Sequence, residues 1–376
     1  MNHFYRIITV FTMIAMILTT TNSEAGNGKP ASEVHSLLQA LEITAPLHFC
    51  GEPAPLNETD VKERLERELL VSLDDQDTVI LWLKRSSRYF PYIEKALKDN
   101  SLPDDLKYVV IAESALKPLA ASNKGAVGFW QFIESTGERY GMTINNNIDE
   151  RRNLFTATDA AMKYFGDLYA LLGSWTLAAA AYNMGEDGLL TEMLMQKEKN
   201  YYHLYLNEET QRYVFRILAA KMILSNPQKY GYFLKEEDLY KPLPYETIEI
   251  TVDDPVPLHI IAQAANTYFK LIKDLNPQIK NYHLYSGKYN ILIPRGASSG
   301  FMERYNNILS QFHKEKENSV YTVSKGDTLF TIAKRFRVSV KAIMLWNGIS
   351  STKILSPGDK LLIFADLEKS DTAEKP

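Results

Sequence analysis

The amino-acid sequence predicts a mainly α-helical domain followed by two small α+β modules, each with the order strand, helix, helix, strand (βααβ). Apolar residues recur at helical spacing between residues 61 and 222, and no strand-like alternation of any length occurs there. The last third of the chain contains an internal repeat of about 45 residues. With 376 residues and 45% hydrophobic composition, the chain is long enough for two or three domains with buried cores.

The N-terminal residues are typical of an export signal. His3 and Arg6 precede the apolar run 7–18, which is too short to span a bilayer as a stable anchor, and Ser23-Glu24-Ala25 matches a small-x-small cleavage site. We therefore expect a signal peptide over residues 1–25 and a location in the periplasm or cell envelope. The alternative is a short uncleaved membrane anchor, which leaves membrane association, including association with the outer membrane, open. No cysteine directly follows the apolar run, so we reject a lipid-anchor motif.

Composition excludes several classes of protein. A net charge of −4 argues against a general nucleic-acid binder, so we expect no nucleic-acid partner. Cys50 is the one cysteine, which excludes an intramolecular disulfide framework and a Cys-rich metal site. We expect Cys50 to be buried and inert, with an intermolecular disulfide as the alternative. No spacing of ligand residues indicates a metal, so we expect no metal and no cofactor. Apart from possible membrane association we expect a monomer, and the sequence leaves the oligomeric state open.

The helical domain is expected over residues 61–240, after a loosely structured polar segment over 26–60. Thr158 is expected to cap one helix, and Asn207 another whose first turn is acidic. The Pro-containing stretch Y-K-P-L-P-Y-E at 240–246 ends the domain.

Glu113 is the carboxyl group that the sequence singles out. It lies near the C-terminal end of a helix that Pro118 stops, and its neighbours at i−3, i−4 and i−7 are all apolar. Desolvation and the negative helix end both disfavour the anion, so we expect a raised pKa. A general acid that works near neutral pH requires such a group. The alternative is a glutamate at the core edge that pairs with an arginine.

A constant offset relates the two small modules. Leu258 aligns with Leu329 and Asn276 with Asn347 without gaps, and the closing strands 289–293 and 360–363 fall together. We expect the modules over 247–296 and 319–364. Residues 297–318 are expected to form a polar linker with some helical character, and residues 365–376 a disordered tail.

The segment V-Y-T-V-S-K-G-D-T-L-F-T-I-A through L-S-P-G-D-K-L-L-I resembles a LysM domain over its full length. The resemblance implies binding of N-acetylglucosamine-containing glycans in a shallow groove between two loops. The alternative is that these residues only cap helices and fill the core. The first module has Pro255-Val256-Pro257 in place of the Gly-Asp-Thr turn, so we expect a degenerate LysM-like module. The implied glycan-binding residues are Gly326, Asp327, Thr328, Leu329, Asn347, Gly348 and Ile349.

Four motifs occur in order in the helical domain: E-S-A-L-K-P (113–118), A-S-N-K-G-A-V-G-F-W-Q-F (121–132), A-A-A-Y-N-M-G (179–185) and E-E-T-Q-R-Y-V-F-R-I (208–217). They resemble the motifs of lytic transglycosylases in the goose-lysozyme-like superfamily. D-E-R-R-N (149–153) and the LysM-like tail point to the membrane-bound lytic murein transglycosylase D family. The resemblance implies a mainly α, goose-type lysozyme-like catalytic domain.

The resemblance also implies site residues. Glu113 would be the single catalytic acid and base, and the substrate-binding residues would be Ser122, Gln131, Tyr182, Asn183 and Tyr213. Each has a structural alternative: Ser122 would only shape a turn, for example, and Tyr182 would be an ordinary packed aromatic.

The implied reaction cleaves the MurNAc-β-1,4-GlcNAc bond of peptidoglycan, the expected partner, and forms 1,6-anhydro-MurNAc ends. Two alternatives are a muramidase of the same fold, which would use water, and a non-catalytic peptidoglycan-binding scaffold. Many glycosidases use a second carboxyl group. Asp149 and Glu150 are expected to form a self-neutralising cluster with the arginines that follow them, and Glu186 and Asp187 are the other candidates.

Overall fold

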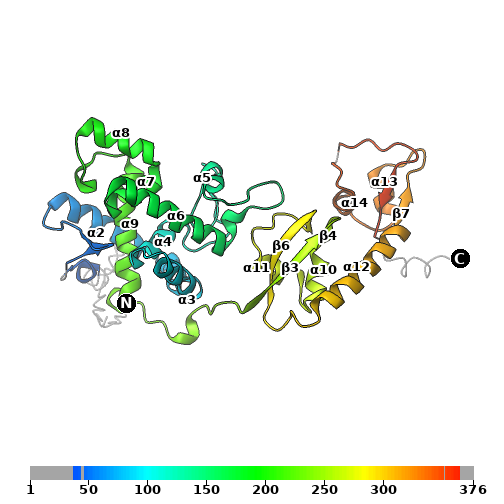
Figure 1. Ribbon diagram of the computed structural model, residues 1–376, viewed down its shortest axis with the longest axis horizontal. Coiled ribbons are helices and arrows are strands. Elements are labelled where there is room, and N and C mark those ends of the chain that lie inside the picture. The colour runs from blue at the N-terminus through cyan, green and yellow to red at the C-terminus, as the bar shows by residue number, and fades with distance from the viewer. Residues whose placement is uncertain (1–36, 44–45, 351, 365–376) are drawn as a thin grey trace, which may run out of the picture. The chain divides into compact units, whose positions relative to one another are not determined.

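A computed structural model describes residues 37–43, 46–350 and 352–364 (Figure 1). The expected signal peptide over 1–25 and the expected tail over 365–376 lie outside the described residues. The chain divides into a short unit that ends at residue 44 and a large unit that begins at residue 45. Over the described ranges, no helix is long and apolar enough to cross a membrane.

The first part of the large unit is helical, which confirms the prediction from apolar spacing. Short 3₁₀ helices at 104–108, 150–152, 201–203, 227–230 and 236–238 connect or extend the longer elements. The α-helices are α2 (Thr59–Asp74), α3 (Gln76–Asp99), α4 (Val109–Ser114), α5 (Glu134–Arg139), α6 (Leu154–Leu172), α7 (Trp175–Met184), α8 (Glu186–Gln196) and α9 (Glu208–Ser225).

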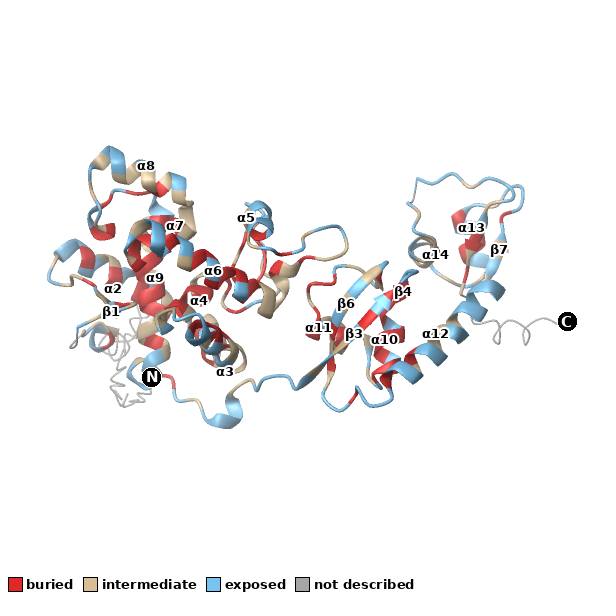
Figure 2. Cartoon of the chain, in the orientation of Figure 1, coloured by how far each residue is buried: buried red, intermediate tan, exposed pale blue. Residues whose placement is uncertain are grey.

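Helix α9 lies at the centre of this domain and packs against α2, α4 and α7 (Figure 2). Its buried face includes Tyr213, Phe215 and Ile217. Helix α7 contributes Ala178 through Ala181, all fully buried. Because these side chains are small, α7 approaches both α6 and α9 closely. This packing fixes the helix that carries Tyr182 and Asn183 against the one that carries Tyr213.

The two predicted helix caps have opposite outcomes. Asn207 caps α9 as predicted, since its side chain accepts a hydrogen bond from the backbone N–H of Thr210. The prediction for Thr158 is wrong, because Asn153, five residues earlier, caps α6. Thr158 is fully buried inside α6, and its hydroxyl accepts a hydrogen bond from the indole of Trp130 at 3.0 Å.

The expectation of a loosely structured segment over 26–60 does not hold for its described end. Strands β1 (His48–Phe49) and β2 (Glu52–Pro53) form a hairpin, and Phe49 is fully buried. The Glu52 carboxylate accepts hydrogen bonds from the first backbone N–H groups of α7, so it caps that helix electrostatically. Cys50 lies in the hairpin turn, where burial raises its thiol pKa well above the usual range.

The first small module contains β3 (Tyr245–Val252), which pairs antiparallel with β6 (Gly287–Pro294) from Tyr245 opposite Pro294 to Val252 opposite Gly287. Residues 297–318 are not a linker with some helical character but mostly a long helix, α12 (Phe301–Asn318), whose Phe301 and Tyr305 belong to the module's core. Its first turn is apolar on one face, which anchors it. The remaining elements are β4 (Val256–Pro257), β5 (His283–Leu284), α10 (Leu258–Ala264) and α11 (Phe269–Leu275).

The second module repeats the strand, helix, helix, strand order, as predicted, and its core contains Ile332, Ile343 and Leu361. The elements of the second module are β7 (Val320–Thr322), α13 (Leu329–Arg335), α14 (Val340–Asn347) and β8 (Lys360–Leu362).

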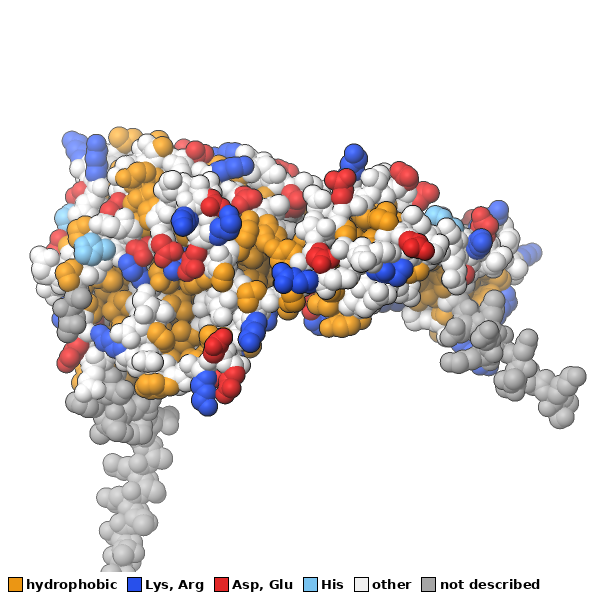
Figure 3. All heavy atoms as spheres, turned by 60° about the horizontal axis from the view of Figure 1, so that its bottom comes forward, with side chains coloured by type: hydrophobic (Ala, Val, Ile, Leu, Met, Phe, Trp, Pro, Cys, Tyr) orange, Lys and Arg blue, Asp and Glu red, His pale blue; other side chains and the backbone are white. Residues whose placement is uncertain are grey.

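Charged side chains of both signs are mixed over the face drawn in Figure 3, with hydrophobic groups between them.

The repeat alignment holds for the helices and fails by one residue at the closing strands. Asn276 exchanges hydrogen bonds with both backbone groups of Leu292, and Asn347 does the same with Leu362. A gapless alignment would have paired Asn347 with Ile363. The connection before β8 is therefore one residue shorter than its counterpart in the first module.

Candidate active site

Glu113 lies in the last turn of α4, as predicted. The helix ends at Ala115, which adopts a left-handed conformation with φ of 51°. The adjacent Ser114 is buried, and its hydroxyl donates hydrogen bonds to the carbonyl oxygens of Val110 and Phe129. Ser114 thus fixes the end of α4 to the loop 120–132 and holds Glu113 in place beside it.

The environment of Glu113 shifts its acidity as predicted. Burial raises the pKa of Glu113 to about 7, while the hydrogen bond from Tyr213 and the positive charge of Arg216 lower it. The charge of Glu209 raises it further. The carboxyl group therefore has comparable protonated and ionised populations near neutral pH, which suits a group that both gives and takes a proton.

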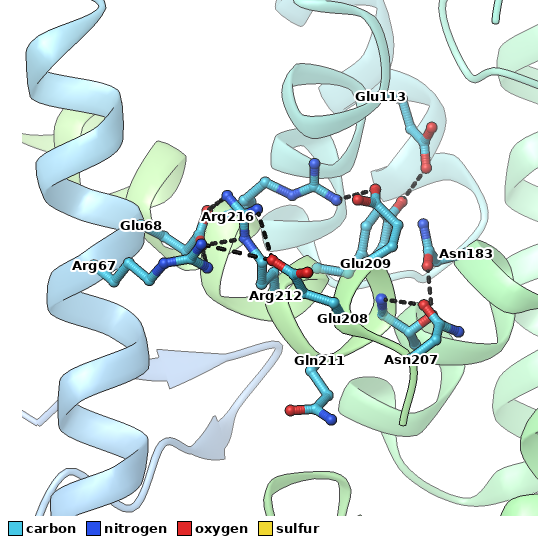
Figure 4. Close-up of polar contacts among 12 residues, drawn as sticks. Arg67, Glu68, Glu113, Asn183, Asn207, Glu208, Glu209, Gln211, Arg212 and Arg216 are labelled. Carbon is cyan, nitrogen blue, oxygen red and sulfur yellow. Dashed lines mark hydrogen bonds and ion pairs between the residues drawn. The ribbon is translucent and has the colours of Figure 1, made fainter. Parts of the chain in front are cut away.

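Helix α9 supplies the polar groups that face Glu113 (Figure 4). The hydroxyl of Tyr213, a fully buried residue, donates a hydrogen bond to Oε1 of Glu113. Arg216, one turn further along, forms an ion pair with Glu209. The alternative prediction, in which Glu113 pairs directly with an arginine, is wrong. Glu113 receives its hydrogen bond from the Tyr213 phenol, and Arg216 forms its ion pair with Glu209.

Helix α7 places Tyr182 and Asn183 in the same region. The Tyr182 hydroxyl donates to the backbone carbonyl of Trp130 at 2.7 Å, and its ring stacks on Phe165 with centroids 4.5 Å apart. Burial, followed by the negative charge of Glu113, raises the pKa of both the Tyr182 and Tyr213 phenols well above their usual range. The charge of Glu113 therefore acts on both phenols, although the three residues come from three different helices.

The position of Asn183 depends on Thr210. Its side-chain oxygen accepts a hydrogen bond from the Thr210 hydroxyl at 2.7 Å, and that hydroxyl also lies within hydrogen-bond distance of the Asn207 side chain. Thr210 is fully buried. A chain of side chains therefore runs along the start of α9 toward Tyr213, and Figure 4 shows Asn183 and Asn207 within it.

Gln131 lies in the loop 120–132 and has a positive φ of 50°. Its side-chain NH₂ donates to the backbone carbonyls of Gly128 and Ala120 at 2.8 and 3.3 Å. The side chain is partly exposed and held by its own loop. The loop brings Gln131 next to Trp130, the residue whose carbonyl Tyr182 contacts.

The D-E-R-R-N motif (149–153) holds this loop through hydrogen bonds from Arg151. The buried pair of Asp149 and Arg151 has an Nε–Oδ1 distance of 2.8 Å, and Arg151 also donates to the carbonyls of Gly125 and Phe132. Burial by itself would raise the pKa of Asp149, but the hydrogen bonds and charge of Arg151 outweigh it and lower the pKa. A Cβ on Gly128 would lie 1.7 Å from the Arg151 carbonyl oxygen, so this close approach requires glycine.

Ser122 shapes a turn, which is the structural alternative to the substrate-binding role that the resemblance implies. It is exposed, and its hydroxyl accepts hydrogen bonds from the backbone N–H groups of Lys124 and Ala126 at 3.2 and 3.1 Å. The hydroxyl therefore closes a turn within the loop. The structure gives no contact that brings Ser122 to Glu113.

Of the four other carboxyl groups considered as catalytic partners, three are engaged elsewhere. Glu186 accepts hydrogen bonds from Arg139 and Tyr164, both at 2.7 Å. Glu150 accepts from the backbone N–H of Thr143, and Asp187 is exposed. Asp149 belongs to the buried pair with Arg151, so the expected cluster is structural. Within the described residues, no group of three or more His, Cys, Asp or Glu side chains is arranged to hold a metal ion.

The residues expected to bind glycan in the second module lie around the start of α13 and the end of α14, and Leu329 and Ile349 both pack against one core. Their side chains have structural roles as well. Thr328 caps α13, Asp327 accepts hydrogen bonds from Tyr321 and the backbone of Ser324, and Asn347 clamps β8. Gly326 and Gly348 adopt positive φ angles of 92° and 62° at the two turns.

Comparison with known proteins agrees with this geometry. The model of the transglycosylase SLT domain matches residues 90–205, and the model of the LysM domain matches residues 321–364. The chain contains a transglycosylase SLT domain and a LysM domain. The SLT match includes Glu113, Gln131, Tyr182 and Asn183 and ends before Tyr213.

Two curated relatives resemble the chain over a longer stretch. Both are named "Membrane-bound lytic murein transglycosylase D", one from Escherichia coli strain K12 and one from Escherichia coli O6:H1 strain CFT073. Each is 32% identical over 295 aligned positions, and the match covers 75% of this chain. The match spans 64% of the length of these relatives, so it covers less than two thirds of them.

Sequence reasoning missed residues that position the candidate site residues or influence their charge. Thr210 orients Asn183, Arg216 and Glu209 set the field at Glu113, and Arg151 holds the loop of Gln131. The acidic cap before Tyr213 was visible in the sequence, but its contact with α7 was not, because that contact joins segments 27 residues apart.

Proposed function

We propose that this protein is a peptidoglycan lytic transglycosylase. It cleaves the MurNAc-β-1,4-GlcNAc bond of murein glycan strands without consuming water and leaves 1,6-anhydro-MurNAc ends. The observation that carries the proposal is the state of Glu113, a carboxyl group in an SLT domain whose pKa burial raises to about 7 and which receives a hydrogen bond from Tyr213. The name of the two relatives supports the substrate class.

Glu113 serves in turn as acid and base. Its protonated form gives the proton to the glycosidic oxygen, and the C1–O bond breaks as the carbonyl oxygen of the substrate's own acetamido group bonds to C1. The Glu113 carboxylate then takes the proton of the C6 hydroxyl, and O6 bonds to C1 while the acetamido oxygen leaves. The proton returns to Glu113, so the cycle balances without water. The donor Tyr213 stabilises the anionic stage.

The remaining site residues position the sugar. Tyr182 and Asn183 on α7 and Gln131 in the loop contact the rings beside the bond that breaks. Ser122 acts by shaping the turn that presents this loop, since its hydroxyl is already engaged there. In this assignment the catalytic residue is Glu113, and Thr210 and Arg151 are positioning residues.

A lyase fits better than a hydrolase of the same fold. An inverting hydrolase needs a second carboxylate to activate water, and a retaining one needs a carboxylate nucleophile. Asp149, Glu150 and Glu186 each have partners of their own, and Glu209 is bound to Arg216. Asp187, the remaining candidate, is exposed. Glu113 without a second carboxylate assigned to catalysis matches a reaction in which the substrate supplies the nucleophile.

The domain arrangement suits an enzyme of the cell envelope. We assign catalysis to residues 61–240 and glycan binding to the LysM domain over 319–364. A degenerate LysM-like role is assigned to the first module, which begins at residue 247 and continues beyond residue 296 through α12. Peptidoglycan is the partner. The N-terminal sequence supports export to the periplasm or cell envelope as part of this proposal, and membrane association is the alternative that it leaves open.

Mass spectrometry of digested peptidoglycan tests the proposal. The wild-type protein should release muropeptides that end in 1,6-anhydro-MurNAc, each lighter by one water than a hydrolysis product. Glu113→Gln should still sediment with sacculi but release nothing. Hydrated products from the wild type would identify a muramidase, and sedimentation without any release by the wild type would identify a binding scaffold.

A further inference from the structure

Tyr205 presents its ring to solvent although its backbone is firmly held. The residue is 81% exposed. The side-chain amide of Gln196 accepts a hydrogen bond from the Tyr205 N–H and donates one to the Tyr205 carbonyl, both at 2.8 Å. The same amide donates to the Glu192 carboxylate at 2.8 Å. An aromatic ring on a fixed backbone loses little conformational freedom when a ligand covers it.

A cavity of about 470 Å³ adjoins this ring. It offers an aromatic face together with amide and carboxylate groups. A pyranose ring has the matching chemistry, because its C–H groups pack on an aromatic face while its hydroxyl and acetamido groups form hydrogen bonds. The lining residues are Glu192, Tyr205, Leu206, Asn207, Glu208 and Gln211.

Polar side chains at the start of α9 connect the cavity with the region of Glu113. Asn207, which lines the cavity, contacts the Thr210 hydroxyl, and that hydroxyl donates to Asn183. Tyr213 follows one turn later on α9 and donates to Glu113 (Figure 4). Asn207 and Tyr213 are six residues apart, which is about 9 Å along a helix. A ligand in the cavity is therefore beyond hydrogen-bond reach of the atoms that react at Glu113.

We propose that Tyr205 and the cavity beside it form a distal glycan subsite, in which an N-acetylhexosamine ring stacks on the Tyr205 phenol. This ring is one that the scissile bond does not join. The inference rests on the proposed function, since it assumes that a glycan strand extends past Glu113. It predicts that Tyr205 contributes to the binding of long strands and leaves the chemical step unchanged.

The test compares kcat and KM on two substrates with the full chain. One is a preparation of long, uncrosslinked glycan strands, and the other is a GlcNAc-MurNAc tetrasaccharide with one cleavable bond. Tyr205→Ala should raise KM for the long strands by roughly tenfold, with kcat unchanged, and should leave both constants for the tetrasaccharide unaltered. Tyr205→Phe keeps the aromatic face and should behave as the wild type.

Leu194→Ala is the matched control, because Leu194 is 77% exposed on the same segment and does not line the cavity. The inference is overturned if Tyr205→Ala leaves the long-strand KM unchanged or weakens both substrates equally. It is also overturned if Leu194→Ala has the same effect, which would indicate a general apolar surface such as one that meets lipid.

A failure of the proposed function is distinguishable from a failure of this inference. A wild-type protein that releases no anhydro product contradicts the proposed reaction and says nothing of Tyr205. Equilibrium binding of the long strands to Glu113→Gln, with and without Tyr205→Ala, then decides on the subsite directly. Equal affinities in that comparison would reject it.

Discussion

The phenol of Tyr213 donates a hydrogen bond to the carboxyl group of Glu113, across 100 residues of sequence. Burial favours the neutral carboxyl and this hydrogen bond favours the anion, and the balance leaves the pKa at about 7. Tyr213 therefore limits how far burial suppresses ionisation. One carboxyl group is held where it exchanges a proton readily in both directions.

The pH dependence of the wild type should reflect this balance. In the proposed reaction the free enzyme needs the protonated form of Glu113, so kcat/KM should fall as the pH rises through about 7. Release of anhydro-muropeptides measured between pH 5 and 9 checks this. A profile that stays flat to pH 9 would exclude Glu113 as the acid with this pKa.

Tyr213→Phe should move the fall of kcat/KM, the alkaline limb of the pH profile, to higher pH. The lost hydrogen bond stabilised the carboxylate, so its removal raises the pKa of Glu113 by about one unit. Activity at pH 8 relative to pH 6 should increase. Tyr201→Phe is the matched control, because the Tyr201 hydroxyl donates to the backbone of α9 rather than to Glu113. It should cost about 1 kcal/mol of unfolding free energy and leave the limb in place.

Arg216 and Glu209 should tune the same limb in opposite directions. The positive charge of Arg216 lowers the pKa of Glu113, and the negative charge of Glu209 raises it. Arg216→Met should therefore shift the alkaline limb to higher pH, and Glu209→Gln should shift it to lower pH. Both shifts should shrink in high salt, because both side chains reach solvent. Shifts in the same direction would mean that the substitutions act through structure and not through charge.

Glu113 should destabilise the folded protein above neutral pH. Its pKa is raised from 4.5 in the unfolded chain to about 7, so the native state binds more protons than the unfolded state between these values. The free energy of unfolding contributed by Glu113 therefore falls as the pH rises through this window. Thermal unfolding should show Glu113→Gln to be more stable than the wild type at pH 8, by roughly 1–3 kcal/mol, and equally stable at pH 4.

Gly128 and Gly125 form a matched pair in the loop that carries Gln131. Both have positive φ, 86° and 79°, but an added Cβ at Gly128 meets the Arg151 carbonyl while one at Gly125 meets nothing within 4 Å. Gly125→Ala should cost about 1–2 kcal/mol of unfolding free energy. Gly128→Ala should cost roughly 2–3 kcal/mol more and reduce activity, because the loop must move away from Arg151. Chemical denaturation and muropeptide release measure both, and equal costs would contradict the close approach.

Local patterns in the sequence were enough for much of this molecule. Apolar spacing gave the helices, the offset between Leu258 and Leu329 gave the two modules, and Asn207 was recognised as a cap from its neighbours alone. Two expectations failed where a distant contact decided the outcome: the hairpin at 48–53 is ordered by Glu52 on α7, and α12 packs instead of linking. The Thr158 cap failed for a local reason, because Asn153 already caps α6.

The sequence by itself determined that Glu113 lies on the buried side of a helix end, because helical periodicity places a residue relative to its neighbours along the chain. Only the tertiary structure decided what faces it. Tyr213 and Arg216 arrive on α9, Asn183 is oriented through Thr210, and Ser122 is used within its own turn. Acidity depends on burial and on charges within a few ångströms, and the packing of distant helices sets those distances.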